Sequence, residues 1–81
     1  MTAQLVNLVL YGRPGCHLCE EMKAGLLAMQ EALGFELSEV AVGWEGELAD
    51  RYGTLLPVLE KDGVEICHYF LDPERLKAAF G

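Results

Sequence analysis

The sequence contains little positive charge. Its 81 residues include 6 Lys and Arg but 13 Asp and Glu, which gives a formal net charge of −7. Proteins that hold the phosphates of a nucleic acid need clustered Lys and Arg side chains. We therefore expect no nucleic-acid partner, and we interpret the acidic balance as favouring solubility.

Long apolar runs are also lacking. No segment approaches the ~20 apolar residues of a membrane-spanning helix. The run from Leu5 to Leu10 is interrupted by Asn7 and has no basic residue ahead of it, so it does not resemble a signal peptide. These absences predict a cytoplasmic protein that binds no membrane.

Cysteine is scarce as well, with three residues in the chain. Secreted domains held together by disulfides carry more cysteines, usually in even numbers. A disulfide in this chain is therefore expected to be transient and catalytic. Hydrophobic residues make up 52% of the sequence, so a compact core is feasible. We predict a monomer with a single domain over residues 1–81.

The pattern of apolar residues predicts the element order β-α-β-α-β-β-α. The expected strands cover residues 5–11, 35–42, 56–60 and 64–70, and the expected helices cover residues 16–33, 45–52 and a segment that starts at 72–73. A helix joins the first two strands, which should therefore be parallel. Asp62-Gly63 indicates a two-residue hairpin turn between the last two strands. The predicted fold class is α/β, with a four-stranded mixed sheet and helices on both faces.

The first predicted helix carries one apolar stripe. The stripe residues recur at spacings of three and four: Cys19, Met22, Leu26, Met29 and Leu33. Gly34 is expected to end this helix. Near the end of the chain, Asp72 is a suitable N-cap and Pro73 a suitable first residue for the last helix.

The segment Cys16-His17-Leu18-Cys19 is the strongest chemical signal in the chain. A Cys-x-x-Cys pair that follows a strand and turn and begins a helix indicates a dithiol redox site. Cys16 would meet the unpaired N–H groups and the positive end of the helix dipole. Such positions lower the pKa of a cysteine from about 8.5 to roughly 3.5–7.5. We therefore expect Cys16 to be the nucleophilic thiolate.

Cys19 lies one helical turn later, on the apolar stripe, and should be the more buried thiol. Burial suits a resolving thiol, which attacks the mixed disulfide formed by Cys16 and releases the product. Two unrelated core cysteines are one alternative. A zinc site is another, but it would need two further ligands from His17, Cys67 and His68. We expect no resident metal.

The sequence around this pair resembles the glutaredoxins, within the thioredoxin fold, and is most similar to short bacterial glutaredoxin-like proteins. The resemblance depends on residues 11–19 (Tyr-Gly-Arg-Pro-Gly-Cys-His-Leu-Cys), on residues 55–58 (Leu-Leu-Pro-Val) and on the element order. It implies a thioredoxin/glutaredoxin-like fold and a thiol–disulfide oxidoreductase that serves electron transport and cell redox homeostasis. It also implies no resident cofactor, with glutathione as the candidate co-substrate.

The resemblance also implies substrate-binding residues. Arg13 stands three places before Cys16, where glutaredoxins carry a basic residue that helps bind a carboxylate of glutathione; the alternative is a solvated loop charge. Pro57 matches the family's cis-proline, which would present the N–H and C=O of Leu56 to the substrate backbone. A proline that opens an edge strand is the alternative. His17, if protonated, would favour the thiolate; otherwise it is an exposed histidine of little influence.

Three departures from the family pattern weaken the case for glutathione. His17-Leu18 replaces Pro-Tyr, and Leu55-Leu56 replaces Thr-Val. The Gly-Gly and acidic segment that grips the γ-glutamyl end of glutathione is absent, and residues 67–72 stand in its place. Asp72 is the residue there that could supply part of this grip. We therefore expect weak glutathione binding together with retained dithiol chemistry.

The expected substrates are a disulfide-bearing protein or a mixed disulfide with glutathione. The expected reductant is glutathione or a thioredoxin-type reductase. The alternative from another class is a non-catalytic binding module that delivers a metal or an iron–sulfur cluster. Two further residues are assigned to packing: Trp44 against the protein, and Cys67 as a small buried hydrophobe on the last strand. The alternative for Trp44 comes from the resemblance, because members of the family often bind partners through the surface near the thiol.

Overall fold

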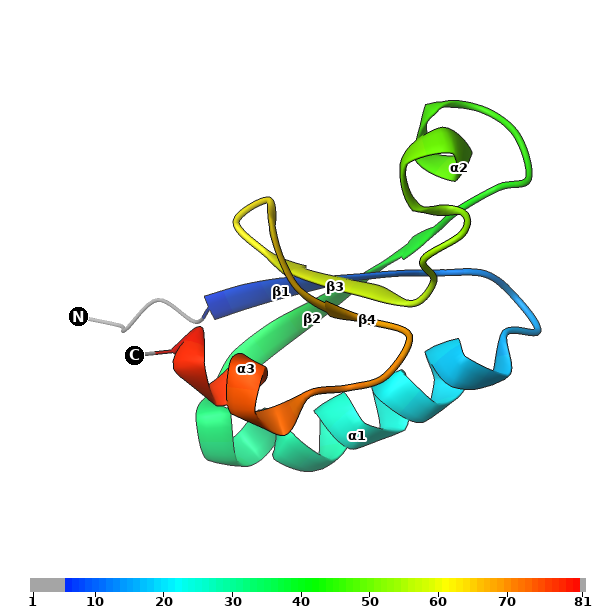
Figure 1. Ribbon diagram of the computed structural model, residues 1–81. Helices are drawn as coiled ribbons and strands as arrows, with labels where there is room; N and C mark the ends of the chain where they lie inside the picture. Colours follow the sequence, from blue (N-terminus) through cyan, green and yellow to red (C-terminus); the bar gives the residue numbers. More distant parts are fainter. Residues whose placement is uncertain (1–5, 81) are drawn as a thin grey trace.

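The computed structural model describes residues 6–80 and shows a sheet with helices on either side (Figure 1). The strands are β1 (Val6–Gly12), β2 (Phe35–Ala41), β3 (Val58–Lys61) and β4 (Val64–His68), and the helices are α1 (His17–Leu33), α2 (Glu47–Tyr52) and α3 (Pro73–Ala78). The predicted element order is therefore confirmed. Leu5, predicted as the first residue of the first strand, lies outside the described residues.

The sheet has the spatial order β2-β1-β3-β4. Because α1 carries the chain back across the sheet, β2 pairs in parallel with β1, and Leu8 lies opposite Leu37. β3 runs antiparallel to β1 and to β4. Asp62 and Gly63, at φ angles of 54° and 79°, form the predicted hairpin turn. The sheet is mixed, as the sequence predicts.

Three element boundaries differ from the prediction by two residues, each for a local reason, and the others differ by one residue or none. α2 begins two residues later, because Gly46, at a φ of 104°, is its N-cap. β3 begins two residues later, because Pro57 has no N–H to donate to a ladder. β4 ends two residues earlier, because Tyr69 takes a φ of 66° and leaves the extended conformation.

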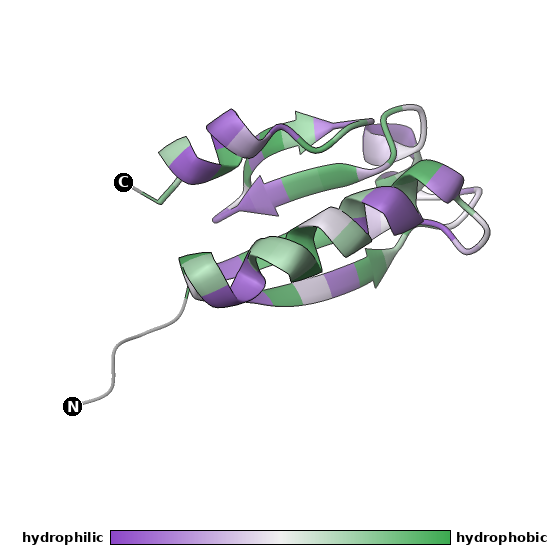
Figure 2. Cartoon of the chain, turned by 90° about the horizontal axis from the view of Figure 1, so that it is seen from below, coloured by the Kyte–Doolittle hydropathy of each residue, from purple (hydrophilic) through white to green (hydrophobic). Residues whose placement is uncertain are grey.

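The main core lies between the sheet and the helices α1 and α3. Figures 1 and 2 show both helices on the same side of the sheet, with α1 along β1 and β2 and with α3 beside β4. The buried side chains of this core are Leu8, Leu10, Met22, Leu26, Phe35, Leu59, Ile66, Cys67 and Leu76. The apolar stripe of α1 therefore faces the sheet, with Met29 and Leu33 partly buried at its end.

α2 lies on the opposite side of the sheet, beyond the end of β1 (Figure 1). It packs through a second cluster formed by the buried residues Val42, Tyr52 and Val58. The prediction of helices on both faces is confirmed. Elsewhere on this face, Ser38 Oγ donates to Asn7 Oδ1 at 3.2 Å across β1 and β2. Among residues 6–80, no helix has the length and apolar character needed to cross a membrane.

A buried carboxylate joins α2 to the sheet. Glu60 of β3 is 7% exposed, and the hydroxyl of Tyr52 donates to its Oε2 at 2.7 Å. The Tyr52 ring stacks on Tyr11, with centroids 4.1 Å apart. The hydrogen bond to Glu60 and, to a lesser degree, burial raise the pKa of Tyr52 well above its usual range. The hydrogen bond between Tyr52 and Glu60 therefore holds the short helix α2 against the sheet. This helix has little other buried surface.

We predict that Tyr52→Phe lowers the free energy of unfolding by about 1–3 kcal/mol, because the Glu60 carboxylate stays buried without its donor. The folded pKa of Tyr52 lies above the unfolded value of about 10. The stabilisation is thus fully present below pH ~10 and is lost as the pH rises through the folded value. Urea denaturation at neutral and alkaline pH measures both effects. If Tyr52→Phe left the free energy of unfolding unchanged at every pH, the stabilising role of this hydrogen bond would be contradicted. As a control, the double variant Tyr52→Phe/Glu60→Gln should recover part of the lost free energy.

Candidate functional site

Cys16 is the N-cap of α1. Its backbone is extended, at φ −84° and ψ 112°, and its Sγ accepts a hydrogen bond from the Cys19 N–H at 3.1 Å. The Cys16 N–H donates to the carbonyl of Arg13 at 3.2 Å, which closes the turn before the helix. The helix therefore begins at His17, one residue later than predicted. A thiolate at this position would be favoured by an N–H donor and by the positive end of the helix dipole.

Cys16 and Cys19 form a disulfide, with their Cα atoms 5.2 Å apart. Cys16 is partly exposed, whereas Cys19 is 8% exposed. The difference in burial that the apolar stripe predicts is present. The sulfur of Cys16 is therefore the more accessible of the two, and the sulfur of Cys19 is the more buried.

The end of β1 packs directly against the inner sulfur. A Cβ atom added at Gly12 would lie 3.1 Å from Cys19 Sγ and 3.3 Å from Cys19 Cβ. Any side chain at Gly12 would therefore push against Cys19. A cleft of about 400 Å³ borders Cys19 on the β2 side, and the ion pair between Lys23 and Glu39 (2.9 Å) lies in its lining.

The guanidinium of Arg13 binds three backbone carbonyls from two segments. Nε donates to the carbonyl of Val42 at 3.2 Å, Nη2 to that of Gly43 at 2.9 Å and Nη1 to that of Gly53 at 3.4 Å. The group also stacks over the Trp44 ring at 4.0 Å. Arg13 thus ties the turn before Cys16 to the β2–α2 loop and the end of α2. It is not a solvated loop charge; its role toward glutathione stays a prediction.

The prediction that Trp44 packs against the protein is wrong. Its side chain is 82% exposed, and the Arg13 guanidinium lies over its ring. The prediction assumed that Trp44 belongs to the apolar face of a helix with Leu48 and Tyr52. Because α2 begins only at Glu47, Trp44 lies in the loop ahead of the helix instead.

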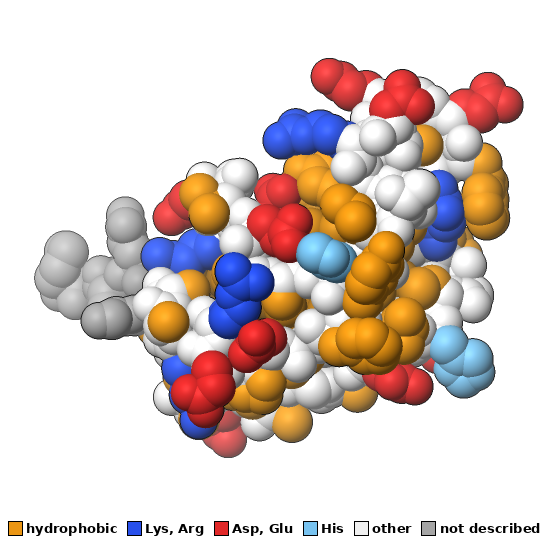
Figure 3. All heavy atoms as spheres, in the orientation of Figure 1, with side chains coloured by type: hydrophobic (Ala, Val, Ile, Leu, Met, Phe, Trp, Pro, Cys, Tyr) orange, Lys and Arg blue, Asp and Glu red, His pale blue; other side chains and the backbone are white. Residues whose placement is uncertain are grey.

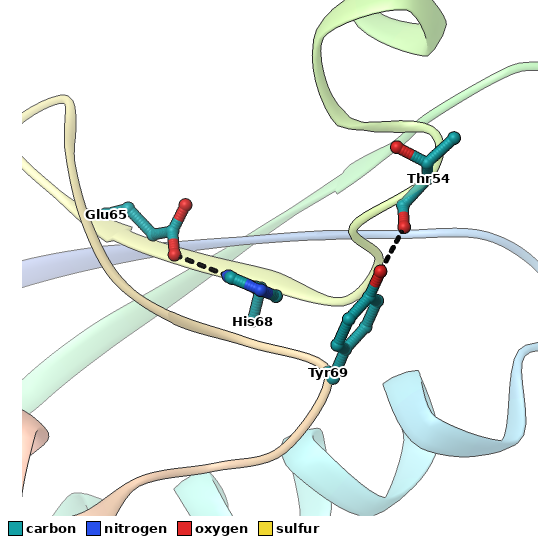
Figure 4. A network of polar contacts seen from close by, with 4 residues as sticks. All are labelled: Thr54, Glu65, His68 and Tyr69. Atoms are coloured by element: carbon teal, nitrogen blue, oxygen red, sulfur yellow. Dashed lines mark hydrogen bonds and ion pairs between the residues drawn. The ribbon is translucent and has the colours of Figure 1, made fainter.

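The loop before β3 contains the predicted cis-proline. The Leu56–Pro57 peptide bond is cis, Pro57 is fully buried and Leu56 is partly buried. The Tyr69 N–H donates to the Pro57 carbonyl at 2.9 Å, and the Tyr69 hydroxyl donates to the Thr54 carbonyl at 2.7 Å (Figure 4). Tyr69 therefore forms hydrogen bonds with the carbonyls of Thr54 and Pro57, on either side of Leu56.

Tyr69 is itself held by its neighbours. The ring of His68 meets the ring of Tyr69 edge-on, with centroids 4.7 Å apart, and His68 Nδ1 lies 2.6 Å from Glu65 Oε2 (Figure 4). Sequence reasoning gave Tyr69 no role. A hydrogen bond between residues 15 positions apart leaves no periodic signal, and the positive φ of Tyr69 occurs where glycine would be expected.

The remaining candidate residues are His17, Asp72 and Cys67. His17 is exposed at the first position of α1. Asp72 caps α3, since its Oδ1 accepts from the N–H groups of Glu74 and Arg75 at 3.1 Å each. Cys67 is a free thiol buried in the main core, and burial raises its pKa. Over the described residues 6–80, no three His, Cys, Asp or Glu side chains are grouped so as to hold a metal ion.

In the reduced protein, we expect Cys16 to react with iodoacetamide at neutral pH much faster than Cys19 or Cys67. Cys16 is accessible and its sulfur lies at a helix N-terminus, so its apparent pKa should fall below the free value of about 8.5. Timed alkylation followed by peptide mapping gives the rate at each cysteine, with the denatured protein as the control. Equal rates at Cys16 and Cys19, or a faster reaction at Cys19, would contradict this order.

Comparisons with known proteins agree with the geometry. Residues 7–81 match the family model described as Glutaredoxin-like domain (DUF836). The chain is similar to protein Ne2328 from Nitrosomonas europaea, whose solution NMR structure has 38% identical residues and a TM-score of 0.88 over 100% of this chain and 98% of that chain. A structure described as that of a malarial protein shares the fold, with 18% identity and a TM-score of 0.54 over 93% of this chain and 92% of its own. The chain matches none of the curated proteins.

Proposed function

The chain belongs to the Glutaredoxin-like domain (DUF836) family, and we propose that it acts as a thiol–disulfide oxidoreductase. The main support is the Cys16–Cys19 disulfide at the N-terminus of α1, where the outer sulfur accepts an N–H hydrogen bond. A structural disulfide has no need of an accessible outer sulfur at a helix terminus. A reactive disulfide needs such a sulfur, because the N-terminus of the helix favours the Cys16 thiolate when the bond is reduced.

In the proposed reaction, the Cys16 thiolate attacks one sulfur of a substrate disulfide. A Cys16–substrate disulfide forms, and the other substrate sulfur leaves as a thiolate that takes up a proton. The Cys19 thiol then loses its proton and attacks Cys16 Sγ, which forms the Cys16–Cys19 disulfide and releases the second substrate thiol. The dithiol loses two electrons and the substrate disulfide gains them.

The loop before β3 suits the positioning of a substrate backbone. Leu56 precedes the buried Pro57, and Tyr69 holds the carbonyls of Thr54 and Pro57 on either side of it. A substrate segment that pairs with the N–H and C=O of Leu56 in strand-like fashion would be aligned beside Cys16. Both thiols and the loop come from one chain, so a monomer suffices.

The oxidised protein must be returned to the dithiol by a two-electron reductant. Two molecules of glutathione or the dithiol of a thioredoxin-type reductase supply these electrons by the same exchange. We place this cycle in a reducing compartment such as the cytoplasm, where thiols are kept reduced. Substrates are then a disulfide-bearing protein or a mixed disulfide with glutathione.

Substitution of single cysteines tests the proposed roles. Cys19→Ser should accumulate a mixed disulfide between Cys16 and a disulfide peptide, because no thiol remains to resolve it. Cys16→Ser should form none, and Cys67→Ser is the matched control that should turn over like the unsubstituted protein. Mass spectrometry after an acid quench detects these species. A protein that reduces no disulfide and is purified with iron and sulfide would instead support a cluster carrier.

We also predict weak activity in a glutathione-coupled assay. Three N–H donors of Arg13 already serve backbone carbonyls, and Asp72 caps α3. Loss of one or two charge-assisted hydrogen bonds, each worth about 1.5–3 kcal/mol, weakens glutathione binding by roughly tenfold or more. Arg13→Ala should lower this activity further. Rates equal to those of an ordinary glutaredoxin would show that residues 67–72 bind glutathione after all.

A further inference from the structure

An exposed tryptophan lies against the side chain of Arg13, three residues before Cys16. Trp44 is 82% exposed, yet the Arg13 guanidinium lies 4.0 Å from the centre of its ring. The backbone carbonyl of Arg13 also accepts the Cys16 N–H. One residue therefore holds both the turn of the reactive cysteine and the indole, so Trp44 lies within the reach of a single arginine side chain from that turn. A large aromatic side chain that is already held in place binds a partner at a low entropic cost.

Three exposed carboxylates follow this tryptophan within six residues of the chain. Glu45, Glu47 and Asp50 are exposed in the loop and first turns of α2. Figure 3 shows acidic side chains gathered over α2, beside exposed apolar and basic side chains. We refer to Trp44, Arg13 and these three carboxylates as the Trp44 surface. Glu20 and Glu21, exposed in the first turns of α1, extend the acidic character to the other side of Cys16.

Three basic side chains lie at this end of the molecule, and one of them is paired with a carboxylate. Lys23 pairs with Glu39 at 2.9 Å, and Arg51 lies over the Tyr52 ring at 5.2 Å. Arg13 donates to three carbonyls. The remaining cations, Lys61, Arg75 and Lys77, lie on the β3–β4 hairpin and on α3, away from α2 (Figure 1). The five exposed carboxylates of Glu20, Glu21, Glu45, Glu47 and Asp50 outnumber the positive charges of Arg13 and Arg51. The net charge at this end of the molecule is therefore negative, which attracts cations and repels anions.

We infer, given the proposed function, that the Trp44 surface docks a positively charged polypeptide segment that carries the substrate disulfide. Lys or Arg side chains that flank the substrate cysteine face the carboxylates of Glu45, Glu47 and Asp50. An apolar side chain of the segment packs on the ring of Trp44. Complementary charge of this kind raises the association rate and excludes wrong partners, so an anionic tripeptide such as glutathione is disfavoured at the same site.

Two disulfide peptides of equal length test the charge preference. Each carries one leucine and one cysteine in mixed disulfide with thionitrobenzoate, and the cysteine is flanked by lysines in one peptide and by glutamates in the other. Release of thionitrobenzoate by the reduced protein gives second-order rate constants. The lysine peptide should react faster by about tenfold at low salt, and the difference should shrink as salt is added. The neutral 2-hydroxyethyl disulfide reports on the dithiol chemistry alone.

Variants separate the two parts of the Trp44 surface. Trp44→Ala should slow the lysine peptide by about fivefold or more, as expected for an aromatic contact, while Trp44→Phe retains most of the rate. Glu45→Gln/Glu47→Gln/Asp50→Asn should abolish the charge preference. The matched control, Glu31→Gln/Asp62→Asn/Glu74→Gln, removes the same charge from distant exposed positions and should retain the preference.

The outcomes are distinguishable. Equal rates for the two peptides at low salt, or equal effects of the two triple variants, would overturn the docking inference while leaving the oxidoreductase intact. No effect of Trp44→Ala on the lysine peptide would overturn the role of the indole. If the unsubstituted protein fails to reduce even the 2-hydroxyethyl disulfide, the proposed function itself fails, and the inference fails with it.

Discussion

The sulfur of Cys16 occupies the N-cap of α1, and the arrangement of the whole dithiol end depends on that placement. β1 must end at Gly12 and the chain must turn sharply so that Cys16 can bond back to the Arg13 carbonyl. Once the helix starts at that point, a spacing of three residues places Cys19 on the face that meets the core. The start of the helix is therefore enough to make the Cys16 sulfur more exposed than the Cys19 sulfur.

Arg13 connects this turn to the rest of the reactive end. Its partners are neutral carbonyls, so its charge is not neutralised by a carboxylate in these contacts. The same side chain positions Trp44, whereas Tyr69 fastens the loop of Leu56 and Pro57 from the other side. Arg13 therefore holds the β2–α2 loop, and Tyr69 holds the loop that contains Leu56 and Pro57.

Much of this fold could be predicted because its determinants are local. The apolar stripe of α1, the Asp62-Gly63 turn and the Asp72 cap each follow from residues close together in the chain. The Cys16–Cys19 pair is local too, and the difference in burial between its sulfurs follows from the start of α1. The resemblance to the glutaredoxins supplied what local pattern could not, namely the cis bond before Pro57.

The features that escaped prediction depend on contacts between distant residues. The exposure of Trp44 follows from the late start of α2, which Gly46 determines. The bond from Tyr69 to Thr54 and the buried pair of Tyr52 and Glu60 join side chains to partners that no periodicity identifies. Hydrogen bonds of this kind are decided by the packed structure, because many polar side chains could in principle satisfy each group.

A redox titration tests the central claim most directly, namely that Cys16 and Cys19 form a two-electron couple. The reduced protein is equilibrated in thiol–disulfide buffers of graded potential, quenched with acid, alkylated and analysed by mass spectrometry. We expect a single two-electron transition in which Cys16 and Cys19 lose their thiols together while Cys67 keeps its own. A bridge to Cys67, or free thiols at Cys16 and Cys19 in every buffer, would contradict the claim.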